Sequence, residues 1–243
     1  MESSIYSDFF YVIINIGCDY MTMKLFLSAI IKYLLGIILV FLLLFIPAGS
    51  LKYYNGWLFM GLLFIPMFFA GIVMMIKNPM LLKSRLDARE KESEQKTVIL
   101  LSGIMFLLGF VIAGLNYRFN WIKLPNMVVI ISSIVFLFSY ILYAEVLREN
   151  TFLSRTIGVQ ENQKVIDTGF YKIVRHPMYL ITLFLFLSIP LILGSIISFI
   201  IFLIYPFIII KRIKNEEKVL EKELKGYKEY KDKVKYRLIP YIW

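Results

Sequence analysis

Cysteine and histidine are almost absent from this sequence of 243 residues. Cys18 is the single cysteine, and His176 is the single histidine. One cysteine makes neither an internal disulfide nor a CxxC metal site. One imidazole excludes a zinc site built from several histidines of the same chain. We therefore expect that the protein binds no metal ion at its functional site and that its fold contains no disulfide.

Charge is absent from long stretches of the sequence. Hydrophobic residues make up 59% of the chain, above the share of about half that is typical of soluble domains. The segments 25–46, 56–76, 98–115 and 127–144 carry one charge among them, at Lys32. About 20 helical residues cross the hydrocarbon core of a bilayer, so each segment is expected to be a transmembrane helix. Lys32 lies near one end of its segment, where a long side chain reaches the interface.

The longest uncharged stretch runs from residue 177 to residue 210. As one straight helix, its 34 residues would be about 50 Å long, against about 30 Å of hydrocarbon. Pro190 and the pair Gly194-Ser195 interrupt the stretch near its middle, and basic residues flank both ends. We therefore predict a helical hairpin that turns near Gly194. The predicted fold class is all-α, a polytopic transmembrane bundle of about six membrane-crossing arms that ends in this hairpin.

Positive charge is concentrated between and after these spans, and the formal net charge is +10. In the six-arm topology, segments 77–97, 148–176 and 211–237 share one face of the membrane. They carry six, five and eleven Lys and Arg residues, respectively. The positive-inside rule places such segments, and hence both termini, in the cytoplasm. The basic tail suits an anionic lipid surface, and we expect no nucleic-acid partner.

The chain divides into three parts. Residues 24–147 hold four predicted transmembrane helices, and residues 148–243 hold the hairpin and the cytosolic C-terminal segment. Residues 1–23 are assigned to an N-terminal extension. Their apolar stretch 11–17 is no signal peptide, because no basic residue precedes it and no small-residue cleavage site follows. The composition, rich in Ile and Lys, favours an integral protein of a prokaryotic cell membrane.

Two polar clusters flank the hairpin, which returns them to the same membrane face. Arg175 and His176 stand before Pro177, a residue suited to the first turn of a helix. The amides of a helix N-terminus, together with Arg175, favour a bound anion. Arg212 and Glu216 are four residues apart and share one face of a helix. Together the clusters suit a zwitterionic ligand such as an amino acid moiety, although basic anchors at a membrane boundary give the same pattern.

Six short motifs follow one another through residues 140–243. They are Arg148-Glu149-Asn150-x-Phe152, Val165-Ile166-Asp167-x-Gly169, Gly169-x-Tyr171-x-x-x-Arg175-His176-Pro177-x-Tyr179, Arg212-Ile213-x-x-Glu216-Glu217-x-x-Leu220, Gly226-Tyr227-x-x-Tyr230 and Arg237-Leu238-Ile239-Pro240. The series resembles the core of the isoprenylcysteine carboxyl methyltransferases and the related phospholipid N-methyltransferases. Those are membrane-embedded enzymes.

The resemblance implies S-adenosyl-L-methionine as the cofactor, bound on the cytosolic side without a Rossmann domain. The sequence agrees in having no GxGxxG motif after a strand. The cofactor-binding residues that the resemblance implies are His176, Tyr179, Arg212, Glu216 and Tyr171. It implies that Glu217 supports the residues around the methionine end. It also implies that Arg175 orients the acceptor, or a cofactor group, near the transferred methyl group, so these two are the expected catalytic residues.

The resemblance also implies that the acceptor is a lipophilic small molecule or lipid that enters sideways from the bilayer. A carboxylate, as in an isoprenylcysteine-type compound, is already ionised and needs no strong base. An amine or hydroxyl needs a proton acceptor, with Glu216, Glu217 or Tyr179 as candidates. The chain departs from the family at Ile181, where a small residue is common. Phospholipid N-methylation, an NADPH-dependent sterol-reductase-like oxidoreductase and a non-catalytic membrane protein remain as alternatives.

The topology makes a direct prediction. Single cysteines introduced at Lys83, Asn162 and Glu229 should all react with a membrane-impermeant thiol reagent from the cytoplasmic side, because all three positions lie in the basic segments. Accessibility of the three positions from different sides would contradict the six-arm arrangement.

Overall fold

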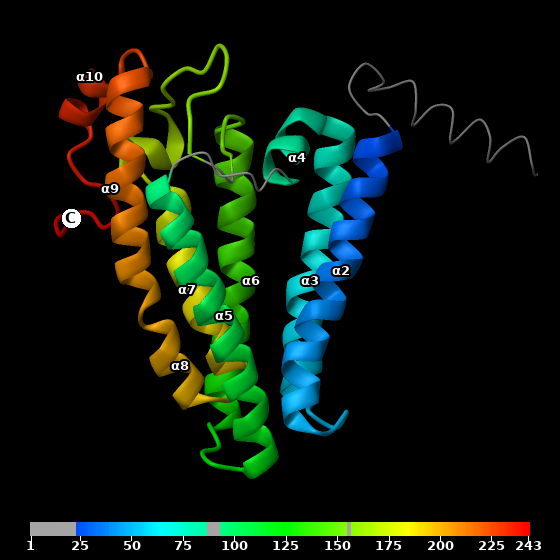
Figure 1. The fold of residues 1–243 in the computed structure, drawn as a ribbon. Coiled ribbons are helices and arrows are strands. Elements are labelled where there is room, and N and C mark those ends of the chain that lie inside the picture. The colour runs from blue at the N-terminus through cyan, green and yellow to red at the C-terminus, as the bar shows by residue number, and fades with distance from the viewer. Residues whose placement is uncertain (1–22, 87–92, 155–156) are drawn as a thin grey trace, which may run out of the picture.

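The computed structural model describes residues 23–86, 93–154 and 157–243, and within these ranges it is helical with no strand. Figure 1 shows long helices that run side by side between two ends of the molecule. The predicted all-α transmembrane bundle is confirmed. The expected extension 1–23 lies outside the described residues, apart from Met23, which begins the first helix.

Four long apolar helices occupy the four segments predicted from the sequence. They are α2 (Met23–Ala48), α3 (Tyr54–Lys77), α5 (Ser93–Phe119) and α6 (Asn126–Glu149). Each has 24 to 27 residues and is therefore about 36–40 Å long, enough to cross a bilayer. Many of their large apolar side chains are exposed, such as Leu35, Phe69 and Ile134. An apolar outer surface of this kind is what contact with lipid requires.

The uncharged stretch forms the predicted hairpin. It consists of α7 (Pro177–Ile192), α8 (Ile196–Phe202) and α9 (Tyr205–Glu223). Gly194 turns the chain with φ of +75°, in the left-handed region that glycine adopts without steric cost. The hydroxyl of Tyr53, the N-cap residue of α3, donates to the carbonyl of Leu193, 2.7 Å away, and so holds the turn against its neighbours. The short break between α8 and α9 lets the returning arm change direction before it reaches the polar end.

Close helix contacts join α5 to α2 and to α8. A Cβ atom at Gly109 would lie 2.2 Å from the ring of Phe202 in α8, and Ser198 Oγ donates to the Gly109 carbonyl at 2.8 Å. A Cβ atom at Gly114 would lie 2.6 Å from the carbonyl oxygen of Leu44 in α2. Small residues at such positions let helix backbones approach closely within a membrane. The close packing of α5 therefore fixes the position of the hairpin relative to α2 and α3.

The polar connections lie at one end of the bundle. α4 (Pro79–Leu86) and α10 (Tyr227–Lys233) both occupy this end (Figure 1). Lys32 of α2 reaches it too, because its Nζ donates to the carbonyl of Leu86 at the end of α4, 2.7 Å away. Lys32, the single charge of segment 25–46, thus caps a helix C-terminus at the interface.

The close approach of α5 to α8 can be tested with two alanine substitutions. Gly109→Ala should lower the free energy of unfolding by about 1–3 kcal/mol, because the methyl group has to displace the buried ring of Phe202. Gly103→Ala on the same helix meets nothing within 4 Å and should leave stability unchanged or slightly higher. Thermal melting in detergent compares the two variants, and equal melting temperatures would contradict this packing.

Candidate active site

A pocket opens at the polar end between α9, the N-terminus of α7 and the coil that follows α6. Its open space, including the mouth, measures about 800 Å³. The pocket therefore lies where the two arms of the hairpin return to the same membrane face.

The N-terminus of α7 is built as the sequence predicts, with Pro177 in its first turn and His176 as the N-cap. The C-terminal segment of the chain runs alongside it. The backbone amide of Arg175 donates to the carbonyl of Tyr236 and that of His176 to the carbonyl of Arg237, both at 2.9 Å. These two amides, just before the first turn of α7, are therefore engaged by the chain itself.

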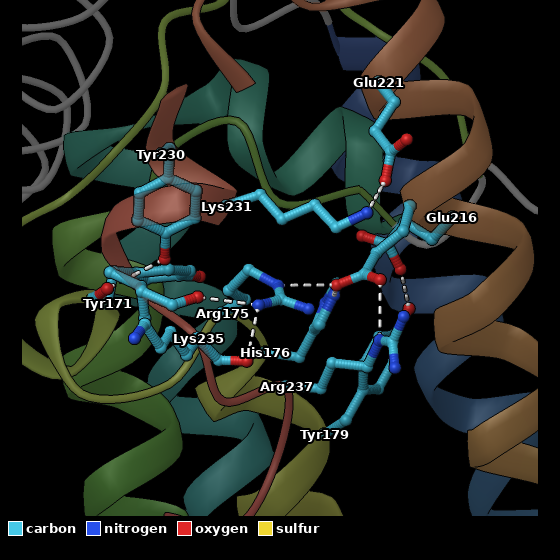
Figure 2. Close-up of polar contacts among 12 residues, drawn as sticks. Tyr171, Arg175, His176, Tyr179, Glu216, Glu221, Tyr230, Lys231, Lys235 and Arg237 are labelled. Carbon is cyan, nitrogen blue, oxygen red and sulfur yellow. Dashed lines mark hydrogen bonds and ion pairs between the residues drawn. The ribbon is translucent and has the colours of Figure 1, made fainter. Parts of the chain in front are cut away.

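Glu217 of α9 is the centre of a buried ionic cluster. Its partners Arg175, His176 and Arg237 are labelled in Figure 2. Glu217 is only 3% exposed. Its Oε1 accepts from Arg175 Nε at 2.7 Å and lies 3.3 Å from His176 Nε2, while its Oε2 accepts from Arg237 Nε at 2.7 Å. Two guanidinium groups thus compensate one buried carboxylate, as a buried charge requires.

Arg175 also donates from a second guanidinium nitrogen to the backbone. Its Nη1 atom donates to the carbonyls of Val234 and Lys235 at 2.6 and 2.8 Å. The residue is buried, and its side chain therefore ties α7, α9 and the C-terminal segment together. The expected role of Arg175 in orienting an acceptor stays a prediction. The contacts of its side chain show that it stabilises the fold.

Tyr179 of α7 and the α9 residues Arg212 and Glu216 form a second polar group, which lines the pocket. The hydroxyl of Tyr179 accepts from Arg212 Nε at 2.8 Å and donates to Glu216 Oε2 at 2.5 Å. Arg212 and Glu216 are one helical turn apart, as predicted from their spacing. A cationic and an anionic side chain are thus held side by side, with a tyrosine hydroxyl between them.

Tyr171 lies in the short 3-10 helix η1 (Gly169–Lys172), at the other side of the pocket. Its hydroxyl accepts from Nδ2 of Asn150 at 3.1 Å, and its backbone carbonyl accepts from the hydroxyl of Tyr230 at 2.8 Å. Burial raises the pKa of the Tyr171 phenol, so the hydroxyl stays protonated. Tyr171 is therefore fixed as a neutral wall residue by contacts from two other segments.

The structure brings all seven predicted site residues to this end of the bundle. Six of them line the pocket: Tyr171, Arg175, His176, Tyr179, Arg212 and Glu216. Glu217 lies behind them. The sequence motifs contained Asn150 and Arg237 but pointed to no role for either, and both contact predicted site residues. In the described ranges, no three His, Cys, Asp or Glu side chains gather as a metal site requires.

Residues 126–226 match the family model described as phospholipid methyltransferase. The matched region begins with α6, includes the whole hairpin and ends just before α10. It supports a membrane methyltransferase, and the predicted resemblance to this group of membrane enzymes is confirmed over these residues. No curated protein matches the sequence.

The buried cluster predicts a large effect of one isosteric substitution. Glu217→Gln removes the charge that compensates Arg175 and Arg237, so the free energy of unfolding should fall by about 3–5 kcal/mol. Glu145→Gln is the matched control, because Glu145 pairs with Arg148 on an exposed helix surface and should leave the melting temperature unchanged. If thermal melting in detergent shows equal small shifts for both variants, the cluster does not stabilise the fold.

Proposed function

We propose that this protein transfers a methyl group from S-adenosyl-L-methionine to a lipophilic acceptor held in the membrane. The observation that carries the proposal is the pair of opposite charges, Arg212 and Glu216, fixed on the pocket side of α9 by Tyr179. A guanidinium binds a carboxylate and a carboxylate binds an ammonium group. The pair therefore complements the zwitterionic methionine end of the cofactor.

The residues present fit the cofactor in two further respects. Glu216 Oε2 takes the bond from Tyr179, and no described residue donates to Oε1, which leaves that oxygen for an ammonium group. Apolar side chains line another part of the pocket, among them Ile157, Val165 and Leu220, and these suit the adenine ring. One pocket thus combines a charged part and an apolar part for the two ends of the same molecule.

When bound, the cofactor would supply an electrophilic methyl group on a sulfonium, to whose carbon a nucleophile bonds in line while the bond to sulfur breaks and S-adenosylhomocysteine leaves. For this reaction, the protein mainly has to align the nucleophile with the methyl group and to exclude water. Tyr179, Arg212 and Glu216 would hold the methionine end. We assign His176, at the N-terminus of α7, to the pocket wall beside Tyr179, since the two rings lie 5.7 Å apart.

We assign Arg175 and Glu217 a positioning role in the reaction. Both oxygens of Glu217 accept hydrogen bonds, and Arg175 donates to Glu217 and to two carbonyls. These contacts hold His176 and the start of α7 against α9. Pocket geometry would therefore depend on the pair even though neither group has to touch the transferred methyl.

Two classes of acceptor follow from the site. A carboxylate of an isoprenylcysteine-type compound would attack as the anion and would need no base. The description of the matched family favours a second candidate, N-methylation of a phospholipid amine. That reaction releases a proton, for which Glu216 and Tyr179 are the candidate acceptors among the residues that line the pocket.

Binding of S-adenosylhomocysteine to the purified protein tests the proposal. Arg212→Ala and Glu216→Ala should each weaken binding by roughly 10- to 150-fold, because each loses a charge-assisted contact worth about 1.5–3 kcal/mol. Lys214→Ala is the control, since this exposed residue of α9 is not among the residues that line the pocket. Calorimetry in detergent measures the three affinities.

Two outcomes of that experiment would count against the proposal. If the wild-type protein shows no affinity for S-adenosylhomocysteine but binds NADPH, the oxidoreductase alternative replaces it. If all three variants lose affinity to the same small extent, the basic residues of α9 act as membrane anchors and the assigned contacts are wrong.

A further inference from the structure

Tyr227 is the first residue of α10 and lines the pocket, yet its hydroxyl group has no hydrogen-bond partner among the described residues. The residue is 4% exposed, and the hydroxyl oxygen is closed off from water. Buried tyrosine hydroxyls are normally paired, because an unpaired polar group loses its hydration without compensation. An unpaired one in a pocket wall therefore points to a partner that binds there.

Other buried tyrosines of the described chain show the usual arrangement. Tyr230, one helical turn after Tyr227, donates to the carbonyl of Tyr171 at 2.8 Å. Tyr53 donates to the carbonyl of Leu193, and Tyr205 donates to Thr182. The unpaired hydroxyl is thus a feature of Tyr227 and of its place in the pocket, and buried phenols elsewhere in this fold do not share it.

The surroundings of Tyr227 combine apolar contacts with a polar tip. The ring packs in a small cluster with Leu224 and Tyr230, against which Val159, Val165 and Leu220 lie. Burial, followed by the nearby carboxylates of Glu217 and Glu216, raises the pKa of the Tyr227 phenol. The hydroxyl is therefore a neutral group that has a proton to donate, in an otherwise apolar wall.

We propose that Tyr227 donates a hydrogen bond to the adenosyl part of the bound cofactor, at a ring nitrogen or a ribose oxygen. The inference rests on the function proposed above and adds a residue to that site. Arg212 and Glu216 take the charged end of the ligand, so the apolar part of the pocket that includes Tyr227 and Val165 is left for the base and ribose. These groups offer the acceptor atoms that an isolated O–H donor needs.

The ligand reaches this hydroxyl only if part of the covering wall shifts. Val159 and Val165, which pack against the cluster, belong to coil and are partly buried, whereas Leu220 is held within α9. The coil is the part of the wall that can move without breaking a helix. Binding is therefore expected to move this coil away from Tyr227 while the helical side of the pocket stays in place.

Two phenylalanine substitutions separate a ligand contact from a structural one. Tyr227→Phe should weaken binding of S-adenosylhomocysteine by about 3- to 10-fold, the effect of one neutral hydrogen bond, without lowering the melting temperature of the free protein. Tyr53→Phe removes a paired hydroxyl at the opposite end of the bundle. It should lower the melting temperature by about 2–4 °C and leave the affinity unchanged. Calorimetry and thermal melting in detergent provide both readouts.

Ligand analogues then locate the contact. The 1-, 3- and 7-deaza and the 2′- and 3′-deoxy forms of S-adenosylhomocysteine each remove one acceptor. One of them should bind the wild-type protein more weakly than the parent compound, yet bind the Tyr227→Phe protein as well as the parent does. Equal affinities of the wild-type and Tyr227→Phe proteins, or a lower melting temperature for Tyr227→Phe, would overturn the assignment. Absence of binding to the wild-type protein would instead reject the proposed function itself.

Discussion

The buried carboxylate of Glu217 joins three segments that are far apart in the sequence. Arg175 comes from the start of α7, Glu217 from α9 and Arg237 from the C-terminal segment. A single buried carboxylate is costly, and so is a buried guanidinium, but together they compensate each other. This buried ionic cluster therefore favours a single arrangement of the two arms of the hairpin. His176, Tyr179 and the pocket side of α9 take their positions from that closure.

Helix packing within the membrane supplies a second constraint. Gly109 and Gly114 bring α5 into contact with α8 and α2, and Tyr53 holds the turn of the hairpin. These contacts lie in the apolar part of the bundle, whereas the Glu217 cluster lies at the polar end. The hairpin is thus held at both ends. Its two polar motifs are kept close enough to act on one ligand, although about 35 residues separate them in the sequence.

The sequence predicted the spans and the hairpin well because both follow from properties that are local in the chain. The length of an uncharged stretch decides whether it crosses once or twice, and four-residue spacing decides that Arg212 and Glu216 share a face. The family resemblance identified further residues that come to the pocket. The contacts of the C-terminal segment could not be predicted from such local properties. Nothing in the local pattern of Arg237 shows that it reaches Glu217, 20 residues earlier in the chain.

For the same reason, the sequence could not separate residues that the proposed ligand would contact from residues that hold the site together. Arg175 and Arg212 both border the pocket, and only the fold shows that Arg175 is bound to Glu217 whereas Arg212 is bound to Tyr179. Tyr227 and Tyr230 belong to one short motif, yet one hydroxyl is paired and the other is not. Such distinctions depend on tertiary neighbours, which spacing along the chain does not specify.

The central claim is that this pocket catalyses methyl transfer to a molecule in the bilayer. The most direct measurement supplies the purified protein, in vesicles made from native lipid extract, with S-adenosylmethionine that carries an isotopically labelled methyl group, and analyses the lipids by mass spectrometry. The account predicts a lipophilic product that gains one labelled methyl group and that is lost with Arg212→Ala. If the purified protein binds the cofactor but no lipid gains the labelled methyl group, the proposed methyl transfer is contradicted.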